Sequence, residues 1–575
     1  MEGSLWCRGA TICRQHLYLP NLEGARFKIM QRKHLFVIGI LMSFAALRAE
    51  ANSYTVKAGG GGDYSTIQSC ASAISPGDTC TVYAGTYNEV VTISAGTSGN
   101  YKTLTVNSGD TVYVYGFVIN SHTKVNGFYI TRPSSPSSNS CVAVAGNSTD
   151  WAITNNVMYA CGGGAMIEEP VGANVQSTSH GYIAGNTLSY ACSTSSAPNV
   201  CEGMYISGDY HLIENNDISH VSDAITNFGV RNVYRSNTFH DASPNDCGSH
   251  SSNCHIDFIE SEPVINVSRP TQYNIYEENI IRNNLGGNGH AFLTQADGCG
   301  GQCFGVIIRY NNMAHVGTYG IIDDNSGSTR SPGFSYIKAY NNSWVDFNNS
   351  GQTVIVGHQN GSTAGADINN IYYWPKSING TPYYVDNSSS AGYSAGSNIA
   401  YCTGSCSFQN RTQSGSFASD AAGNIVANPN FANYASNDFT LASGSPALGA
   451  GTYLTTATNS GTASTSMSVT DASFFFDGAG IVNADWIRIG SGTPVQIASI
   501  NYSTNVITLA NAVSWSSGAQ IYLYKDSRGN VLITGTNPDI GASPFFPPSA
   551  AAAPPPPPPT SGAPNPPTGL KATVQ

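Results

Sequence analysis

The sequence predicts an all-β protein built as a solenoid, in which a short unit of β-strands is repeated along the chain. Three observations indicate this fold. Gly, Ser, Asn and Thr are abundant while only 10% of the 575 residues are charged, a composition typical of strands joined by tight turns. One short pattern recurs along the middle of the chain. The period of this pattern suits coils of short strands. Helical repeats are not expected, because the long Ala-, Leu-, Glu- and Lys-rich stretches that they need are scarce.

The recurring pattern is an apolar residue, two spacers, Asn, one spacer and another apolar residue. Successive Asn residues are 30, 30, 21, 42 and 32 positions apart, at Asn156, Asn186, Asn216, Asn237, Asn279 and Asn311. Val125, Phe128 and Ile130 extend the pattern backwards, and Asn342 with Trp344 extends it forwards. A coil of about 20 residues holds three short strands and three turns. We expect the Asn side chains to form an inward-facing ladder at one turn, bonded to the backbone and to the Asn above.

The first 51 residues predict a secretory signal peptide. A basic stretch over 31–34 precedes an apolar run, Leu35–Leu47, and the small-residue motif Ala49-Glu50-Ala51 follows as a cleavage site. Met30 stands where such a peptide normally starts. Thirteen apolar residues are too few to cross a bilayer. We therefore expect an exported protein, extracellular or on the cell surface, without membrane insertion.

The cysteines predict disulfides. Two of the 14 lie in the leader and the other 12 come as six neighbouring pairs, as expected of an exported chain. The pairs are Cys70/Cys80, Cys141/Cys161, Cys192/Cys201, Cys247/Cys254, Cys299/Cys303 and Cys402/Cys406. The alternative is a zinc site at Cys247, His250, Cys254 and His255, although zinc ligands are usually spaced as C-x-x-C and H-x-x-x-H.

The charge indicates which partners to expect. The chain carries 24 basic and 35 acidic residues, a formal charge of −11. Without the seven basic and three acidic residues of the leader, 17 and 32 remain, a charge of −15. Such a surface repels nucleic acid and anionic lipid, so no nucleic acid partner is expected.

Both ends of the repeat region carry further motifs. The first is a run of short segments, Tyr54-Thr-Val56, Gly62–Gln68, Pro76-Gly-Asp78 and Gly85–Glu89. The second is Asn428-Pro-Asn-Phe431, Asp438–Leu441 and Ser445-Pro-Ala447, with Pro538–Ala542 further on. With the Asn repeat, these motifs resemble the right-handed parallel β-helix superfamily of pectate lyases and related polysaccharide lyases and glycoside hydrolases. The resemblance implies such a helix over 52–455, with a short helix from about Ser65 capping its first coil and closing coils after 428.

The rest of the chain predicts a modular tail. Alternating strands at Asp485–Gly490, Val495–Ile497 and Val506–Leu509 indicate a small inserted β-barrel or sandwich over 456–525. We expect a last strand and a final coil over 526–548. A proline-rich spacer follows over 549–565. Residues 566–575 resemble the opening strand of a fibronectin type III domain, which suggests that the chain is truncated there.

The strand after each Asn brings polar residues into alignment. Equivalent positions of successive coils stack about 4.8 Å apart, so a band of acidic residues and a histidine is expected along one groove. The band comprises Glu168, Glu202, Asp223, Asp257, Glu260, His290, Asp323 and Asp324. Among these, Glu168, Glu202, Asp223 and Glu260 are candidate substrate-binding residues.

Two chemistries could use this band. In a hydrolase, Asp257, Asp323, Asp324 and His290 would supply acid and base, and carboxyls two coils apart, about 9.6 Å, would suit inversion. In a lyase, Asp257, Glu260 and Asp323 would hold Ca²⁺ against a uronate while Arg309 or Lys338 removes a proton. The polygalacturonase order of motifs is not followed, because Gly289-His290 comes before Asp323-Asp324.

Three functions are compatible with these features. The first is a secreted polysaccharide lyase or glycoside hydrolase that acts as a monomer on an extracellular polysaccharide. The second is a non-catalytic adhesin or surface carbohydrate-binding protein, and the third is a structural matrix protein. A cation above an acidic groove would favour the enzyme, and a shallow, evenly polar surface the matrix protein.

Overall fold

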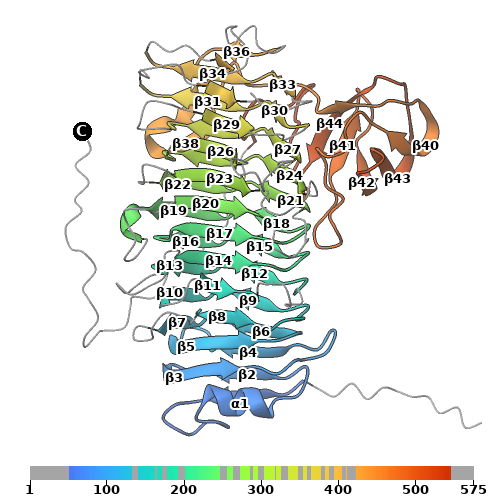
Figure 1. Ribbon diagram of the computed structural model, residues 1–575. Coiled ribbons are helices and arrows are strands. Elements are labelled where there is room, and N and C mark those ends of the chain that lie inside the picture. The colour runs from blue at the N-terminus through green and yellow to red at the C-terminus, as the bar shows by residue number, and fades with distance from the viewer. Residues whose placement is uncertain are drawn as a thin grey trace, which may run out of the picture. The chain divides into compact units, whose positions relative to one another are not determined.

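The structure of the protein is a computed structural model that describes residues 51–544, apart from sixteen segments. These segments are 133–139, 162–164, 171–177, 192–200, 247–255, 263–271, 285–288, 296–302, 318, 325–334, 348–353, 359–363, 377–382, 387–393, 405–408 and 411–422. The main body is a right-handed parallel β-helix, as the repeat predicts. Figure 1 shows its coils stacked from helix α1 (Ile67–Ala73) at one end to β36 (Ile425–Val426) at the other.

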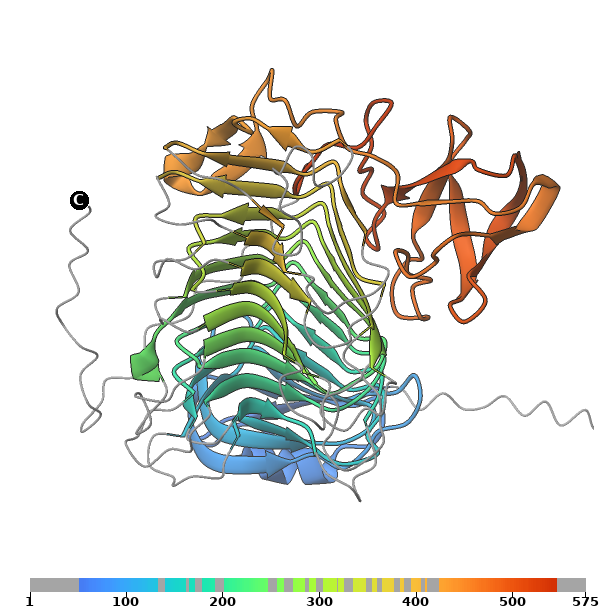
Figure 2. The ribbon, with the colours of Figure 1, turned by 45° about the horizontal axis from the view of Figure 1, so that its top comes forward.

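Each regular coil contributes one strand to each of three faces, called A, B and C, and Figure 2 shows the strands of successive coils aligned within them. Face A consists of β1 (Ser53–Val56), β2 (Thr79–Val82), β4 (Lys102–Val106), β6 (Thr123–Asn126), β9 (Ala152–Thr154), β12 (Tyr182–Ala184), β15 (Leu212–Glu214), β18 (Val233–Arg235), β21 (Gln272–Glu277), β24 (Phe304–Arg309), β27 (Ser335–Tyr340), β30 (Ala366–Ile368) and β33 (Ser394–Gly396).

Faces B and C follow face A in each coil, and the long strands β3 (Gly85–Thr92) and β5 (Val112–Ile119) run through both. Face B consists of β7 (Tyr129–Arg132), β10 (Val157–Cys161), β13 (Thr187–Ser189), β16 (Asp217–Ser219), β19 (Thr238–Ala242), β22 (Ile280–Asn284), β25 (Asn312–Ala314), β28 (Ser343–Val345), β31 (Ile371–Trp374), β34 (Ile399–Cys402) and β36. Face C consists of β8 (Val142–Val144), β11 (Ala165–Glu168), β14 (Glu202–Ile206), β17 (Asp223–Asn227), β20 (Ile256–Ser261), β23 (Gly289–Gln295), β26 (Tyr319–Asp324), β29 (Val354–His358), β32 (Tyr383–Asp386) and β35 (Gln409–Asn410).

The Asn ladder lies at the turn from face A to face B, and its prediction is confirmed. Asn186 is representative: its Nδ2 donates to the carbonyl of Ile153 at 2.9 Å, and its Oδ1 accepts from the backbone N–H of Asn156 at 3.0 Å. The same bonds continue to Asn370 and Asn398, beyond the predicted repeat. Because these amides are buried, the bonds compensate for their lost hydration. The ladder therefore sets the register of the coils.

Helix α1 caps the first coil, as expected from the sequence. The side chain of Thr66 accepts from the backbone N–H of Ser69 at its N-terminus, and Ile67 is fully buried against the core. The carboxylate of Glu89 accepts from the backbone N–H groups of Ile67 and Gln68. The helix thus covers strand edges that the first coil would otherwise expose.

Two of the six predicted disulfide pairs are confirmed, and in each of these pairs both cysteines lie within the described residues. Cys70 is bonded to Cys80 and Cys141 to Cys161, each within or between neighbouring coils. A second group of cysteines is disulfide-bonded as well, namely Cys201, Cys303 and Cys402. Their expected partners lie outside the described residues, and these are Cys192, Cys299 and Cys406 in the same order. The pairings of Cys201, Cys303 and Cys402 with those neighbours therefore stay predictions.

Other predicted features also fall outside the described residues. Both cysteines of the Cys247/Cys254 pair are among them, together with His250 and His255 of the alternative zinc site. The same holds for the leader up to residue 50, the proline-rich spacer and residues 566–575. The structure therefore does not test these predictions.

The inserted module is an antiparallel sheet that packs on face A. In sheet order its strands are β39 (Thr455–Thr456), β44 (Gln520–Lys525), β41 (Trp486–Ile489), β42 (Val495–Asn501), β43 (Val506–Trp515) and β40 (Gly461–Ser468). Val233, Ile275 and Ile307 point outward from face A and share a buried apolar cluster with Phe475 and Phe476 of the module. The module therefore covers side chains that would otherwise be exposed on face A.

The closing segments differ from the expected closing coils. Strands β37 (Phe431–Asn433) and β38 (Asp438–Leu441) pair antiparallel and fold back on face B, where Phe439 packs near Tyr373. Within 526–544, the described part of the expected final coil, no strand forms. Ile540 instead packs on face B, and the backbone N–H of Gly541 donates to the carbonyl of Asn369. No helix in the described part of the chain is long and apolar enough to span a membrane.

Candidate functional site

Four polar side chains stand in one register at the start of the face C strands. Glu202 pairs with Asp223, and Asp257 pairs with His290. The pairing of Ile225 with Ile259 sets Asp223 opposite Asp257. We call Glu202, Asp223, Asp257 and His290 the acidic column. Its members lie on successive coils, about 4.8 Å apart along the helix axis, as the sequence predicts.

Three members of the acidic column, Asp223, Asp257 and His290, are linked by hydrogen bonds from coil to coil. The backbone N–H of Asp257 donates to Oδ1 of Asp223 at 2.9 Å, and the backbone N–H of His290 donates to Oδ1 of Asp257 at 3.2 Å. Nδ1 of His290 is also hydrogen-bonded to Oδ1 of Asp257. The exposed fractions of Asp223, Asp257 and His290 are 5%, 2% and 5%. The column is therefore nearly buried, rather than solvated like ordinary surface carboxylates.

Burial and mutual repulsion perturb the carboxyls of the column. Burial, with the charges of Asp257 and Glu202, raises the pKa of Asp223 well above its usual value. Burial and the charge of Glu260 likewise raise the pKa of Glu202. Both shifts favour the protonated acid, because a low dielectric and a like charge both oppose ionisation. A carboxyl poised to hold a proton beside another carboxylate is the usual requirement for acid–base catalysis.

The candidate substrate-binding residues Glu168 and Glu260 lie in the next register of face C. Glu168 aligns with Tyr205, Tyr205 with Thr226 and Thr226 with Glu260. Glu168 is exposed, and partial burial raises the pKa of its carboxyl. Tyr205 packs against Phe228 with ring centroids 4.7 Å apart. The two glutamates therefore flank an aromatic side chain beside the acidic column.

The structure does not align Asp323 and Asp324 with the acidic column. His290 pairs with Tyr319, whereas Asp323 pairs with Thr294 and Asp324 with Gln295. Asp323 therefore lies four residues further along its strand than the column, about 13 Å at 3.3 Å per residue. The side chains of Asp323 and Asp324 lie outside the described residues.

Arg309 and Lys338 lie on face A under the inserted module, which corrects their expected place beside the carboxylates. The guanidinium of Arg309 has no exposed surface and donates to Glu277 at 2.7 Å and to Asp485 at 2.7 and 2.8 Å. Lys338 is 1% exposed, and its Nζ lies 2.7 Å from Oδ2 of Asp471. Neither cation can reach a substrate on face C. Both join the module to the helix instead.

The face C strands lack the cation that a lyase would use as its base. None of the strands from β8 to β35 on this face contains Lys or Arg. Within the described residues, no group of three or more His, Cys, Asp or Glu side chains is placed to hold a metal ion. The described side chains of these strands thus include acids and His290, but no base of the lyase kind.

Face B carries a histidine site that was missed in the sequence analysis. His240 lies 3.0 Å from Asp217 and 2.7 Å from Asp241. Burial opposes its charge, but the bonds to both carboxylates raise the pKa of His240 to about 9. The ladder offers a signal for such residues, because side chains one and three positions after each Asn point outward on face B. Asp217 follows Asn216 by one position, and His240 follows Asn237 by three.

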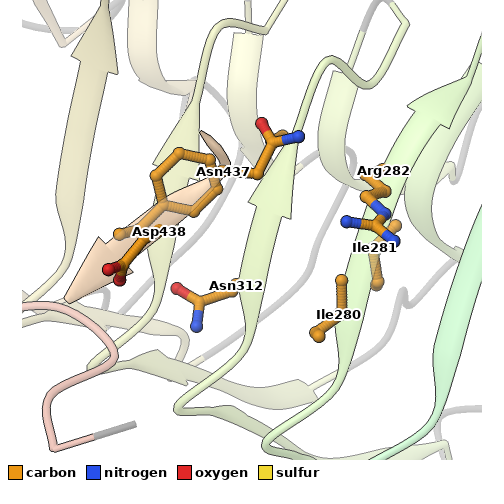
Figure 3. Close-up of a pocket in the computed structure, with 8 residues that line it drawn as sticks. Ile280, Ile281, Arg282, Asn312, Asn437 and Asp438 are labelled. Carbon is orange, nitrogen blue, oxygen red and sulfur yellow. The ribbon is translucent and has the colours of Figure 1, made fainter. Parts of the chain in front are cut away.

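A small pocket lies on face B beside this histidine site. Arg282 aligns with His240 on the next coil. Figure 3 shows Arg282 across the pocket from Asn437 and Asp438 of the closing hairpin, with Asn312 nearby. The pocket volume is about 60 Å³, room for a few water molecules. It is therefore too small to serve as a polysaccharide groove.

Comparisons with known proteins give structural similarities alone. No protein-family model matches the chain, and no curated protein matches its sequence. A PL6 family alginate lyase is 15% identical, with a TM-score of 0.40 over 60% of this chain and 52% of the lyase. The chain thus spans about half the length of that lyase. A GH136 lacto-N-biosidase from Eubacterium ramulus is 12% identical, with a TM-score of 0.43 over 61% and 67% of the two chains. A pectate lyase is 13% identical, with a TM-score of 0.37 over 70% and 92%.

Proposed function

We propose that the protein is a secreted carbohydrate-active enzyme that hydrolyses an extracellular polysaccharide along face C. The observation that carries the proposal is the acidic column, in which Asp223 and Asp257 occupy adjacent coils and the environment of Asp223 favours its protonated form. Glycoside hydrolysis needs one carboxyl that donates a proton and a second that acts as a carboxylate. Adjacent coils, about 4.8 Å apart, suit this division of roles.

The roles follow from the surroundings of each group. Asp223, surrounded by acids, donates a proton to the glycosidic oxygen. Asp257 is the carboxylate, since His290 holds it through Nδ1 and the backbone N–H. A carboxyl separation near 5 Å is typical of retention, whereas Glu202 and Asp257, two coils or about 9.6 Å apart, would suit inversion. Glu168 and Glu260 bind sugar hydroxyls beside the column.

Secretion and the polysaccharide partner belong to the same proposal. The disulfides support an oxidising compartment, and the leader supports export. We expect a monomer, with neither nucleic acid nor membrane insertion.

A calcium-dependent lyase is the second enzymatic candidate. Burial, with the repulsion of neighbouring carboxylates, raises the pKa values of Asp223 and Glu202. A cation would relieve that repulsion, and carboxylate oxygens are the ligands that Ca²⁺ prefers. Asp257 and Glu260 would hold the ion, which would neutralise a uronate, whereas Asp323 lies about 13 Å further along its strand and would not reach the same ion. The hydrolase is favoured because no Lys or Arg stands on the described face C strands.

A non-catalytic carbohydrate-binding protein is the third candidate. It is favoured by the near-complete burial of the column, since exposed fractions of 2% and 5% at Asp257 and Asp223 suit a structural ladder as well as an acid pair. A measurement of enzymatic activity distinguishes a catalytic acid pair from a structural ladder.

The decisive experiment is incubation of the protein with neutral and uronate polysaccharides, with and without a calcium chelator. Reducing ends and the ultraviolet absorbance of unsaturated uronate are followed together. Reducing ends alone, unaffected by chelation, support the hydrolase. Unsaturated products lost on chelation support the lyase. If neither signal appears with folded protein, the binding protein is favoured.

A further inference from the structure

The inserted module leaves a cleft where it meets the last coils of face A. The cleft lies between strands β27, β30 and β33 on one side and β39 with residues 470–474 of the module on the other. Its volume is about 580 Å³, within the range of roughly 300–1,000 Å³ typical of ligand sites. It is formed by face A and the module, whereas the acidic column belongs to face C.

The lining of the cleft is rich in hydroxyl and amide groups. Seven of its residues offer neutral hydrogen-bonding side chains, namely Ser394, Ser397, Thr452, Thr455, Thr456, Thr470 and Asn505. Tyr336 and Tyr453 add phenol rings, and Ile368 and Phe474 add apolar surface. Hydroxyl groups beside aromatic rings match the two surfaces of a sugar, which has polar edges and apolar C–H faces.

The charges at the cleft cancel each other. Asp471 is its one acidic lining residue among those described, and Nζ of Lys338 lies 2.7 Å from Oδ2 of Asp471. Oδ1 of Asp471 accepts from the backbone N–H of Ser473 at 2.9 Å. Because this carboxylate is already compensated, the cleft offers neither a free cation for an anion nor a free anion for a cation.

Tyr336 distinguishes the cleft from the covered part of face A. Tyr273 and Tyr336 both have positive φ, 52° and 60°, at the second position of β21 and of β27, which are two coils apart with β24 between them. The ring of Tyr273 stacks on Tyr502 of the module with centroids 3.8 Å apart. Tyr336 is 37% exposed and contacts no aromatic ring among the described residues. At this coil the module leaves a ring surface open, where a sugar face can stack.

We propose that this cleft is a second, non-catalytic site that binds a neutral sugar segment of the polysaccharide. The inference rests on the proposed function for the class of ligand. It gives the inserted module a role, because the module supplies the hydroxyl groups opposite Tyr336. Binding there would hold the polymer on the protein independently of catalysis on face C.

The test measures calorimetric binding of four neutral hexasaccharides, of xylose, glucose, mannose and galactose, to the full secreted chain. Tyr336→Ala removes the stacking surface, and Ser394→Trp fills the cleft from the exposed first position of β33. Tyr182→Ala is the matched control, since Tyr182 also lies on face A and is 38% exposed but is far from the cleft lining. Reducing-end release is measured in parallel on each variant.

We expect at least one hexasaccharide to bind, with about five- to tenfold weaker binding in Tyr336→Ala and none in Ser394→Trp. Tyr182→Ala should bind like the wild type. Unchanged affinity in both cleft variants, or no binding of any hexasaccharide to the wild type, would overturn the proposal. The proposed function is judged separately by its products, because it fails if no reducing ends appear or if unsaturated uronate appears with them.

Discussion

Two regions of this protein bury carboxylates with different partners. Under the inserted module, burial raises the pKa of Asp485, but Arg309 limits the rise to about 6. In the acidic column, burial raises the pKa of Asp223 and the neighbouring Asp257 adds to the rise. The first arrangement holds two parts of the chain together, because opposite charges meet there. The second keeps acids close without a cation from the described face C strands, which is what acid–base chemistry requires.

The largest expected effect is on stability, at the interface with the module. Arg309→Met leaves Glu277 and Asp485 buried without their cation, and breaking a buried ion pair typically costs about 3–5 kcal/mol. Urea unfolding followed by fluorescence should show a loss of this size. Arg282→Met on face B is the control and should change stability by less than about 0.5 kcal/mol. Equal effects of the two substitutions would remove the contrast between the regions.

The second prediction concerns the acidic column. Asp257→Asn keeps the shape of the side chain but removes the carboxylate, and general acid–base groups contribute about 10²–10⁴-fold to rate. We expect kcat for the active polysaccharide to fall by at least about 10²-fold. Asp150→Asn, which alters an exposed carboxylate near face A, should retain full activity. An active Asp257→Asn variant would assign the column a structural role.

The third prediction uses the contrast between the acidic column and the Asn ladder. Asn accepts backbone N–H groups from coil to coil in the ladder, so Asp223→Asn can keep its bond from Asp257 while losing the repulsion. The folded-state pKa of Asp223 is raised, so the wild type loses stability as pH rises above the unfolded value near 3.8. The variant should become the more stable protein, by about 1 kcal/mol, as the pH increases. A thermal unfolding series over pH tests this, and a less stable variant at neutral pH contradicts it.

The smallest expected effect concerns His240 on face B. Its folded-state pKa is raised from 6.5 to about 9 by Asp217 and Asp241. The stability from this pairing is fully present below pH 6.5 and is lost as pH rises through about 9. His240→Gln should therefore flatten the decline in melting temperature between these values. An unchanged slope would show that His240 does not titrate over this interval.

Part of the candidate site could be predicted from the repeat alone. Glu202, Asp223, Asp257 and His290 align because each lies at the first or second position of the same strand of its coil, and that alignment follows from the Asn period. The positions of Arg309 and Lys338 could not be predicted in this way. Both are near the column in sequence, but they belong to another face, and their burial depends on a module more than 100 residues further along the chain.

The closing segments and the cleft show the same limit. The motifs at 428–447 indicate the end of the solenoid but not their path, because packing against Tyr373 decides that they fold back on face B. The sequence by itself determined the coil, its inward Asn ladder and the faces of its strands, since these depend on short-range alternation and on contacts between successive coils. Only the tertiary structure decided which cations are buried, which ring stays open and how large the cleft is. Those features arise where the module meets face A, and they depend on contacts between residues that no local pattern relates.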